Sequence, residues 1–70
     1  MSSVNDFNYS FRRVYPENKI RSTVLKYSDR AALIEATFPD GVFWFVVTKN
    51  SVSSSYSNKN KAMEDFENEK

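Results

Sequence analysis

The chain has 70 residues, contains neither cysteine nor histidine, and carries a formal net charge of +1 at pH 7. These numbers exclude disulfides, thiol chemistry, the commonest metal ligands and the usual general base of an enzyme. Because a chain this short rarely builds a walled catalytic pocket, we expect a non-catalytic protein that needs no cofactor and no metal.

The apolar residues predict a globular core and no membrane span. Hydrophobic residues make up 40% of the chain and aromatic residues 16%. No apolar run reaches the roughly 20 residues of a transmembrane helix, and the N-terminus does not have the pattern of a signal peptide. We therefore expect one cytoplasmic domain over residues 1–70 with no membrane partner.

The N-terminal part of the chain predicts strands. Residues 1–6 are polar, and we expect them to be disordered. From Phe7 to Tyr15, aromatic and polar residues alternate, and this period of two predicts a strand. The row Phe7, Tyr9 and Phe11 would then lie on one face. After a turn at residues 16–18, residues 20–27 are rich in β-branched side chains and predict a second strand.

The centre of the chain predicts a hairpin. Residues 31–36 are compatible with a short helix, but the turn sequence that follows them favours a strand. Pro39, Asp40 and Gly41 have the composition of a three-residue hairpin loop, and residues 42–48 predict the strand that follows it. This loop sets Phe38 opposite Val42.

The expected pairing gives the hairpin two apolar faces. One face would hold Ile34, Ala36 and Phe38 with Val42, Trp44 and Val46, and we expect the C-terminal helix on it. The other would hold Phe43 and Phe45 beside Glu35 and Thr37. Three coverings are open for this second face: the N-terminal aromatic row folding over it as a small open barrel, a symmetric dimer, or a bound ligand.

The C-terminal part predicts a helix that depends on its packing. Residues 52–57 form either an edge strand or a loop, and Asn58 has the character of an N-cap. A helix follows from Lys59 to about Glu69, with Ala62, Met63 and Phe66 on one side. Its lysines precede its acids, which opposes the helix dipole, so docking on the sheet must hold it. The expected fold is α+β: a small antiparallel meander of three to five strands within residues 7–57, packed by the helix at 58–69.

The C-terminal half resembles a known family of DNA-binding domains. The spacing of Tyr56, Asn58, Ala62 and Phe66 is similar to the end of AP2-like domains, including the arm-binding domains of tyrosine recombinases. The resemblance covers about residues 42–67 and implies a three-stranded sheet with a C-terminal helix, whose open sheet face enters the major groove. Asn58 stands where the family has threonine, and no base-reading residue can be carried over.

The leading hypothesis is a nucleic-acid-binding module of the kind found in phage or bacterial accessory proteins. Arginines and lysines on the N-terminal strands would contact phosphates, and two aromatic residues two apart on one strand can each stack a base. The alternative is an adaptor or inhibitor that binds another protein, or a second copy of itself, through the aromatic sheet face or an exposed strand edge. The low net charge favours this alternative. The candidate binding residues are Arg12, Arg13, Arg21, Lys26, Phe43 and Phe45.

Overall fold

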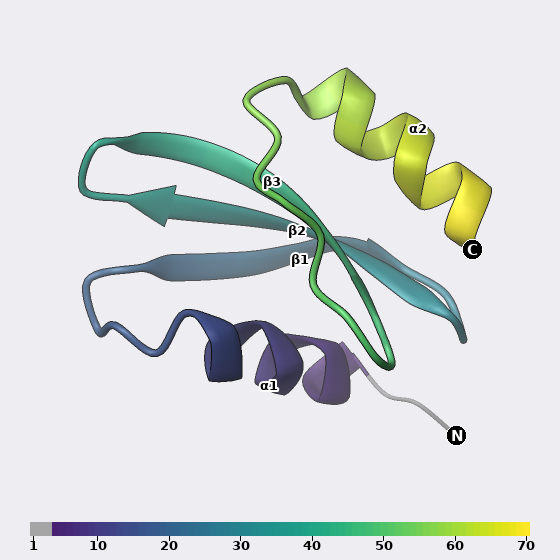
Figure 1. The fold of residues 1–70 in the computed structure, drawn as a ribbon, viewed down its shortest axis with the longest axis horizontal. Helices are drawn as coiled ribbons and strands as arrows, with labels where there is room; N and C mark the ends of the chain where they lie inside the picture. The colour runs from purple at the N-terminus through teal and green to yellow at the C-terminus, as the bar shows by residue number, and fades with distance from the viewer. Residues whose placement is uncertain (1–3) are drawn as a thin grey trace.

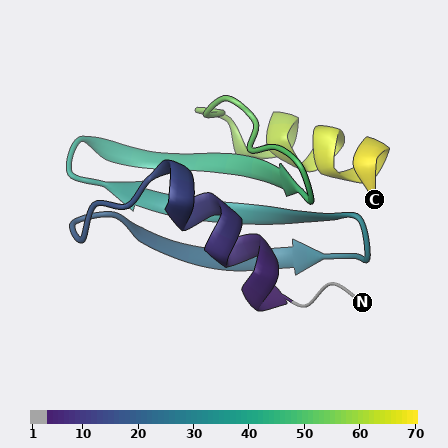
Figure 2. The same ribbon diagram turned by 60° about the horizontal axis from the view of Figure 1, so that its bottom comes forward.

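The protein is a three-layered α+β fold (Figure 1), seen here in a computed structural model that describes residues 4–70 and the side chains from Asp6 onward. The elements in chain order are α1 (Val4–Val14), β1 (Arg21–Tyr27), β2 (Ala31–Phe38), β3 (Gly41–Thr48) and α2 (Lys59–Glu69). The strands form one antiparallel sheet in the order β1-β2-β3. This confirms the predicted antiparallel sheet and C-terminal helix. Figure 2 shows that α1 crosses the face of the sheet opposite to α2.

The predicted N-terminal strand is wrong, because residues 4–14 form helix α1. Positions 7, 11 and 15 satisfy both a period of two and the helical spacing of i, i+4 and i+8, so the aromatic residues there fit either structure. Tyr9 distinguishes the helix from the strand. It would share the apolar face of a strand, but on the helix it points away from the sheet and is 67% exposed, whereas Phe7 and Phe11 are buried. Of the expected disordered segment, residues 4–6 belong to α1 and residues 1–3 lie outside the described part.

The β2–β3 hairpin has a shorter loop than predicted. Only Pro39 and Asp40 form the turn, and Phe38 pairs with Gly41 rather than with Val42. Gly41 has φ of +154°, a conformation that other residues rarely adopt. A register change of one residue moves every side chain of β3 to the other face relative to β2. The predicted division of the hairpin into two faces is therefore wrong.

The sheet separates two cores. On one side, Phe7 and Phe11 of α1 pack on the buried side chains of Ile34, Phe45 and their neighbours, with Ile20, Ala32, Ala36 and Val47 completing the cluster. The second face of the sheet is thus covered by α1. Of the three coverings left open, the N-terminal segment supplies this one through Phe7 and Phe11, but as a helix rather than as part of an open barrel, and Tyr9 takes no part.

The second core lies between the sheet and α2. Ala62 and Phe66 are buried against Leu33 and Val46, with Met63 and Trp44 packed beside them. The predicted helix bounds and its docking residues are confirmed. Glu35 also lies on this side, where its carboxylate accepts a hydrogen bond of 3.1 Å from the indole nitrogen of Trp44. The Asn58 side chain caps the helix by accepting from the backbone N–H groups of Asn60 and Lys61.

Candidate functional site

The outer edge of β3 is closed by the chain itself. Residues 51–57 run beside it, and Tyr56 exchanges two backbone hydrogen bonds of 2.8 and 2.9 Å with Trp44. Val46 accepts from the backbone of Ser53 and donates to its hydroxyl, while Thr48 donates to the carbonyl of Ser51. The outward backbone groups of Trp44 and Val46 and the N–H of Thr48 therefore have partners within the chain.

The outer edge of β1 is open by contrast. β1 pairs only with β2 over its seven residues, and no other described segment pairs with it. In an antiparallel sheet, successive residues of a strand direct their backbone N–H and C=O groups alternately to its two sides. Trp44 and Val46 of β3 direct theirs away from β2. Followed through β2, the same alternation directs the backbone groups of Ser22 and Val24 to the open side of β1. These groups are available to an added strand.

Exposed apolar side chains accompany this open edge. Leu25 is 36% exposed and lies at an irregularity in the pairing, where β1 has one more residue than β2. Tyr27 is 63% exposed at the end of the strand. Because α2 packs on β2 and β3 but not on β1, β1 is not covered by a helix on the α2 side of the sheet. The open edge thus offers both polar backbone groups and apolar contact area.

The two neighbouring arginines of α1 have different roles. The guanidinium of Arg12 donates to the backbone carbonyls of Ile20 and Glu17, at 2.7 and 2.8 Å. Arg12 therefore fastens the end of α1 to the start of β1 and has fewer N–H groups left for a phosphate. Arg13 is exposed on the other side of the helix, where it lines a hollow with Lys49.

Arg21 and Lys26 are both exposed on β1, near its two ends. Arg21 pairs with Thr37, and Lys26 with Leu33, so both lie on the α2 side of the sheet. The strand contains no acidic residue. Lys26 lies close enough to Glu67 of α2 to help lower the pKa of that carboxyl, although the hydrogen bond from Lys70 is the largest cause. The structure thus places Arg21 and Lys26 on one strand and Arg13 in a different layer.

Phe43 and Phe45 do not form an open stacking face. Phe45 is fully buried, with its ring centroid 4.9 Å from that of Phe11 and 5.1 Å from that of Tyr15. Phe43 is half-buried and packs edge-on against Phe38. The ring of Phe45 is inaccessible to a base while α1 is in place, and the open sheet face implied by the resemblance to AP2-like domains is occupied by α1.

The sequence alone could not identify the outward positions Ser22 and Val24, or that Arg13 and Lys49 line the same hollow. The first depends on which edge of the sheet the serine-rich segment closes, and the second on α1 being a helix. Lys49 did carry a signal, as the only basic residue between positions 31 and 57.

No helix in the described part of the chain is long and apolar enough to cross a membrane. In comparisons with known proteins, no family model matches the chain, and neither a curated protein nor a solved structure is similar to it. The function must therefore be argued from the geometry of the molecule, in which the open edge of β1 is the most complete candidate site.

Proposed function

We propose that the protein is a non-catalytic binding module that takes up an extended segment of a partner protein along β1. The observation that carries this proposal is the difference between the two sheet edges: residues 51–57 close the edge of β3, whereas the seven-residue edge of β1 has no partner in the described chain. In strand addition, main-chain hydrogen bonds supply affinity and alternate side chains supply specificity.

The charge of β1 indicates an acidic partner segment. Arg21 and Lys26 are its only charged residues, and both are exposed. Opposite charges on neighbouring strands stabilise pairing by about 0.2–1 kcal/mol, and like charges destabilise it. A second copy of β1 would bring four positive charges together, so self-pairing is disfavoured. Lysine and a bulge also hinder indiscriminate pairing of edge strands, which leaves a complementary acidic segment as the favoured ligand.

Nucleic acid has weaker support as the ligand of this surface. Arg12 is engaged by backbone carbonyls and Phe45 is buried. The remaining candidate cations lie in different layers, with Arg13 on α1 and Arg21 on the α2 side of the sheet. A protein segment along β1 would instead pair with the backbone N–H and C=O groups of Ser22 and Val24, which already point to the open side of the strand.

The test compares Ser22→Pro with Ser22→Ala. Both substitutions remove the hydroxyl that donates 2.9 Å to Oδ1 of Asn8, but only proline removes the outward backbone N–H. The probe is a peptide of about seven residues in which glutamate alternates with valine, titrated into ¹⁵N-labelled protein. We expect shifts along β1 in the wild type and in Ser22→Ala, and at least a fivefold loss of affinity in Ser22→Pro, since one net hydrogen bond is worth about 1 kcal/mol.

A matched peptide with lysine in place of glutamate tests the charge argument. We expect it to bind more weakly than the acidic peptide, and Arg21→Glu with Lys26→Glu to reverse the order. Equal binding by the proline and alanine variants, or shifts that avoid β1, would overturn the proposal.

A further inference from the structure

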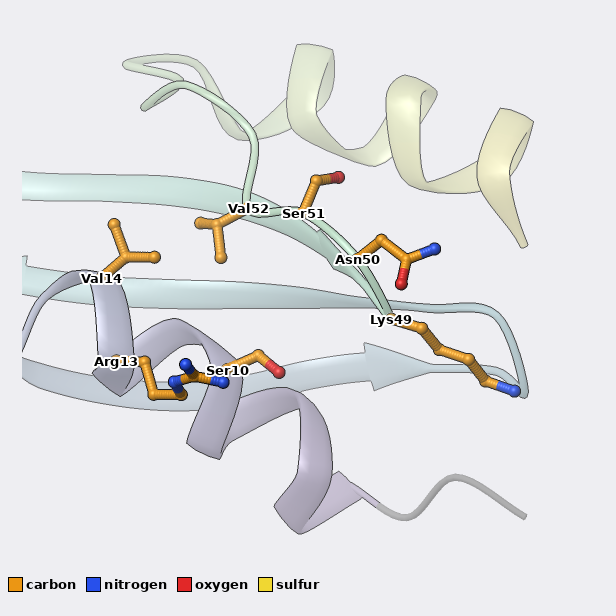
Figure 3. A pocket seen from close by; sticks show the side chains of 7 residues that line it. All are labelled: Ser10, Arg13, Val14, Lys49, Asn50, Ser51 and Val52. Carbon is orange, nitrogen blue, oxygen red and sulfur yellow. The ribbon is translucent and has the colours of Figure 1, made fainter.

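A second surface, separate from β1, lies between α1 and the segment that follows β3. It is a hollow of about 380 Å³, lined by residues from both elements: Ser10, Arg13, Val14, Lys49, Asn50, Ser51 and Val52 (Figure 3). Its volume is near the lower end of the range of small-molecule pockets, about 300–1,000 Å³. It is open to solvent on one side, so a large ligand could enter it with one part only.

The hollow is positively charged, with no acidic residue in its lining. Arg13 comes from α1 and Lys49 from the turn after β3, and Figure 3 shows them at opposite ends of the hollow, with the side chain of Lys49 extending away from Arg13. Neither side chain makes a hydrogen bond or an ion pair with another described residue. Their donors are therefore available, in contrast to those of Arg12, two of which are used by backbone carbonyls.

The other lining groups suit an anionic ligand that also has an apolar part. The hydroxyl of Ser10 and the amide of Asn50 can donate hydrogen bonds beside the two cations. Val14, which is 55% exposed, and the half-buried Val52 both line the hollow. A bare inorganic ion would leave these valines in contact with water, whereas an organic phosphate can cover them.

We propose that this hollow binds the phosphate group of a phosphate ester, with Arg13 as the charged contact in place, the flexible side chain of Lys49 turning in from the far end of the hollow, and Val14 and Val52 against the organic part. A phosphate can accept several charge-assisted hydrogen bonds, and arginine presents its donors in a planar fork that matches it. The ester can come from a free nucleotide or from the backbone of a single nucleic-acid strand.

A neighbouring hollow provides the control. It is lined by Arg30, Thr48, Lys49, Asn50, Asn68 and Glu69, so Lys49 borders both hollows. Arg30 is exposed, like Arg13, but shares its hollow with the carboxylate of Glu69. Replacing Arg30 by glutamine removes the same charge as replacing Arg13, without changing the lining of the proposed site.

The experiment is a ¹⁵N HSQC titration of the full chain with adenosine monophosphate, with adenosine, and with a thymidine oligonucleotide of about ten nucleotides, each at low and at moderate salt. We expect adenosine monophosphate to shift the amides of Ser10, Arg13 and residues 49–52 in a salt-sensitive manner, and adenosine to shift none of them. Arg13→Gln combined with Lys49→Gln should weaken binding about tenfold, while Arg30→Gln should leave it within about twofold.

The oligonucleotide separates the two sources of the ester. Binding of both phosphate ligands with equal affinity indicates a free nucleotide. If the oligonucleotide binds more tightly and with a stronger salt dependence than the nucleotide, and if Arg30→Gln also weakens its binding, the ligand is a strand that crosses both hollows. The proposal is overturned if neither phosphate ligand shifts these amides at millimolar concentration, if adenosine shifts them equally, or if Arg30→Gln weakens nucleotide binding as much as Arg13→Gln.

Discussion

The hydroxyl of Tyr56 donates a 2.7 Å hydrogen bond to Oδ2 of Asp65 in α2, while the backbone of the same tyrosine pairs with Trp44 in β3. One residue thereby joins the segment that closes the edge of β3 to both the sheet and the C-terminal helix. Since α2 buries only Ala62 and Phe66 fully, this polar link adds to a small apolar contact.

Tyr56→Phe should destabilise the fold by about 0.5–1.5 kcal/mol, because it removes the hydrogen bond and retains the packed ring. Urea unfolding followed by tryptophan fluorescence would measure the change. Asp65→Asn is the control, because its side chain keeps an oxygen acceptor, and its cost should be smaller. Equal stability of Tyr56→Phe and the wild type would show that the link contributes nothing.

The same pair predicts a loss of stability at alkaline pH. The hydrogen bond to Asp65 is the largest cause that raises the pKa of Tyr56 above its ordinary value of 10.0, and burial and the negative charge of Asp65 act in the same direction. A folded-state pKa above the unfolded value means that the stabilisation is fully present below about pH 10 and is lost as the pH rises through the folded value. The difference in unfolding free energy between wild type and Tyr56→Phe should therefore be constant near neutral pH and shrink above about pH 10. A difference that stays constant throughout would contradict this assignment.

Two aromatic residues of α1 should respond very differently to truncation. Phe11→Ala should cost about 3–5 kcal/mol, because Phe11 is fully buried between the helix and the sheet. That is a large part of the stability of so small a domain. Tyr9→Ala should change stability by less than about 0.5 kcal/mol, because Tyr9 is 67% exposed. Circular dichroism during thermal unfolding would compare them, and equal losses would favour the strand over the helix.

Arg12 and Arg13 offer a second matched pair. Arg12→Gln should destabilise the protein by about 1–2 kcal/mol through the loss of hydrogen bonds to the carbonyls of Ile20 and Glu17. This corresponds to a fall in Tm of about 4–8 °C for each kcal/mol. Arg13→Gln should leave Tm nearly unchanged, since its side chain makes no bond within the described chain. A larger fall in Tm for Arg13→Gln than for Arg12→Gln would contradict the structural role assigned to Arg12.

A substitution at the N-cap of α2 should be able to increase the stability of the protein. Asn58→Ala should cost about 1 kcal/mol, because the backbone N–H groups of Asn60 and Lys61 lose their acceptor. Asn58→Asp keeps the acceptor and adds a negative charge at a helix start that has no acidic residue in its first turn. We expect a gain of a few tenths of a kcal/mol by urea unfolding, and a loss in Asn58→Asp would oppose this account of the cap.

The C-terminal third of the chain was predictable because its signals agree with one another. Asn58 has the side chain of an N-cap, and the apolar positions 62, 63 and 66 fit only a helix. The N-terminal third was not predictable from periodicity, because Phe7, Phe11 and Tyr15 fit two structures and only their packing against Phe45 separates them.

The candidate site was less accessible to prediction than the fold. In the hairpin, a turn of two residues or of three has the same Pro-Asp-Gly sequence, yet the choice decides on which face Phe45 lies. The open edge of β1 and the hollow at Arg13 both follow from how distant segments pack together. The sequence identified several arginines and lysines as candidate contacts, but it could not show which of their side chains have no hydrogen-bond partner in the described part of the molecule.

The sheet between two separate cores also bears on how the molecule opens. Successive residues of β2 belong alternately to the α1 core and the α2 core, so this strand is packed on both of its faces. Each helix, by contrast, packs against the sheet on one face only. Because the α2 core has fewer buried residues than the α1 core, and Val52 packs against the α1 core, we expect a partial opening in which α2 detaches together with residues 53–57 while α1 and the sheet stay assembled. Such an excursion would uncover the edge of β3 as well, and amide hydrogen exchange should therefore be faster in α2 and at Trp44 than in the centre of β2.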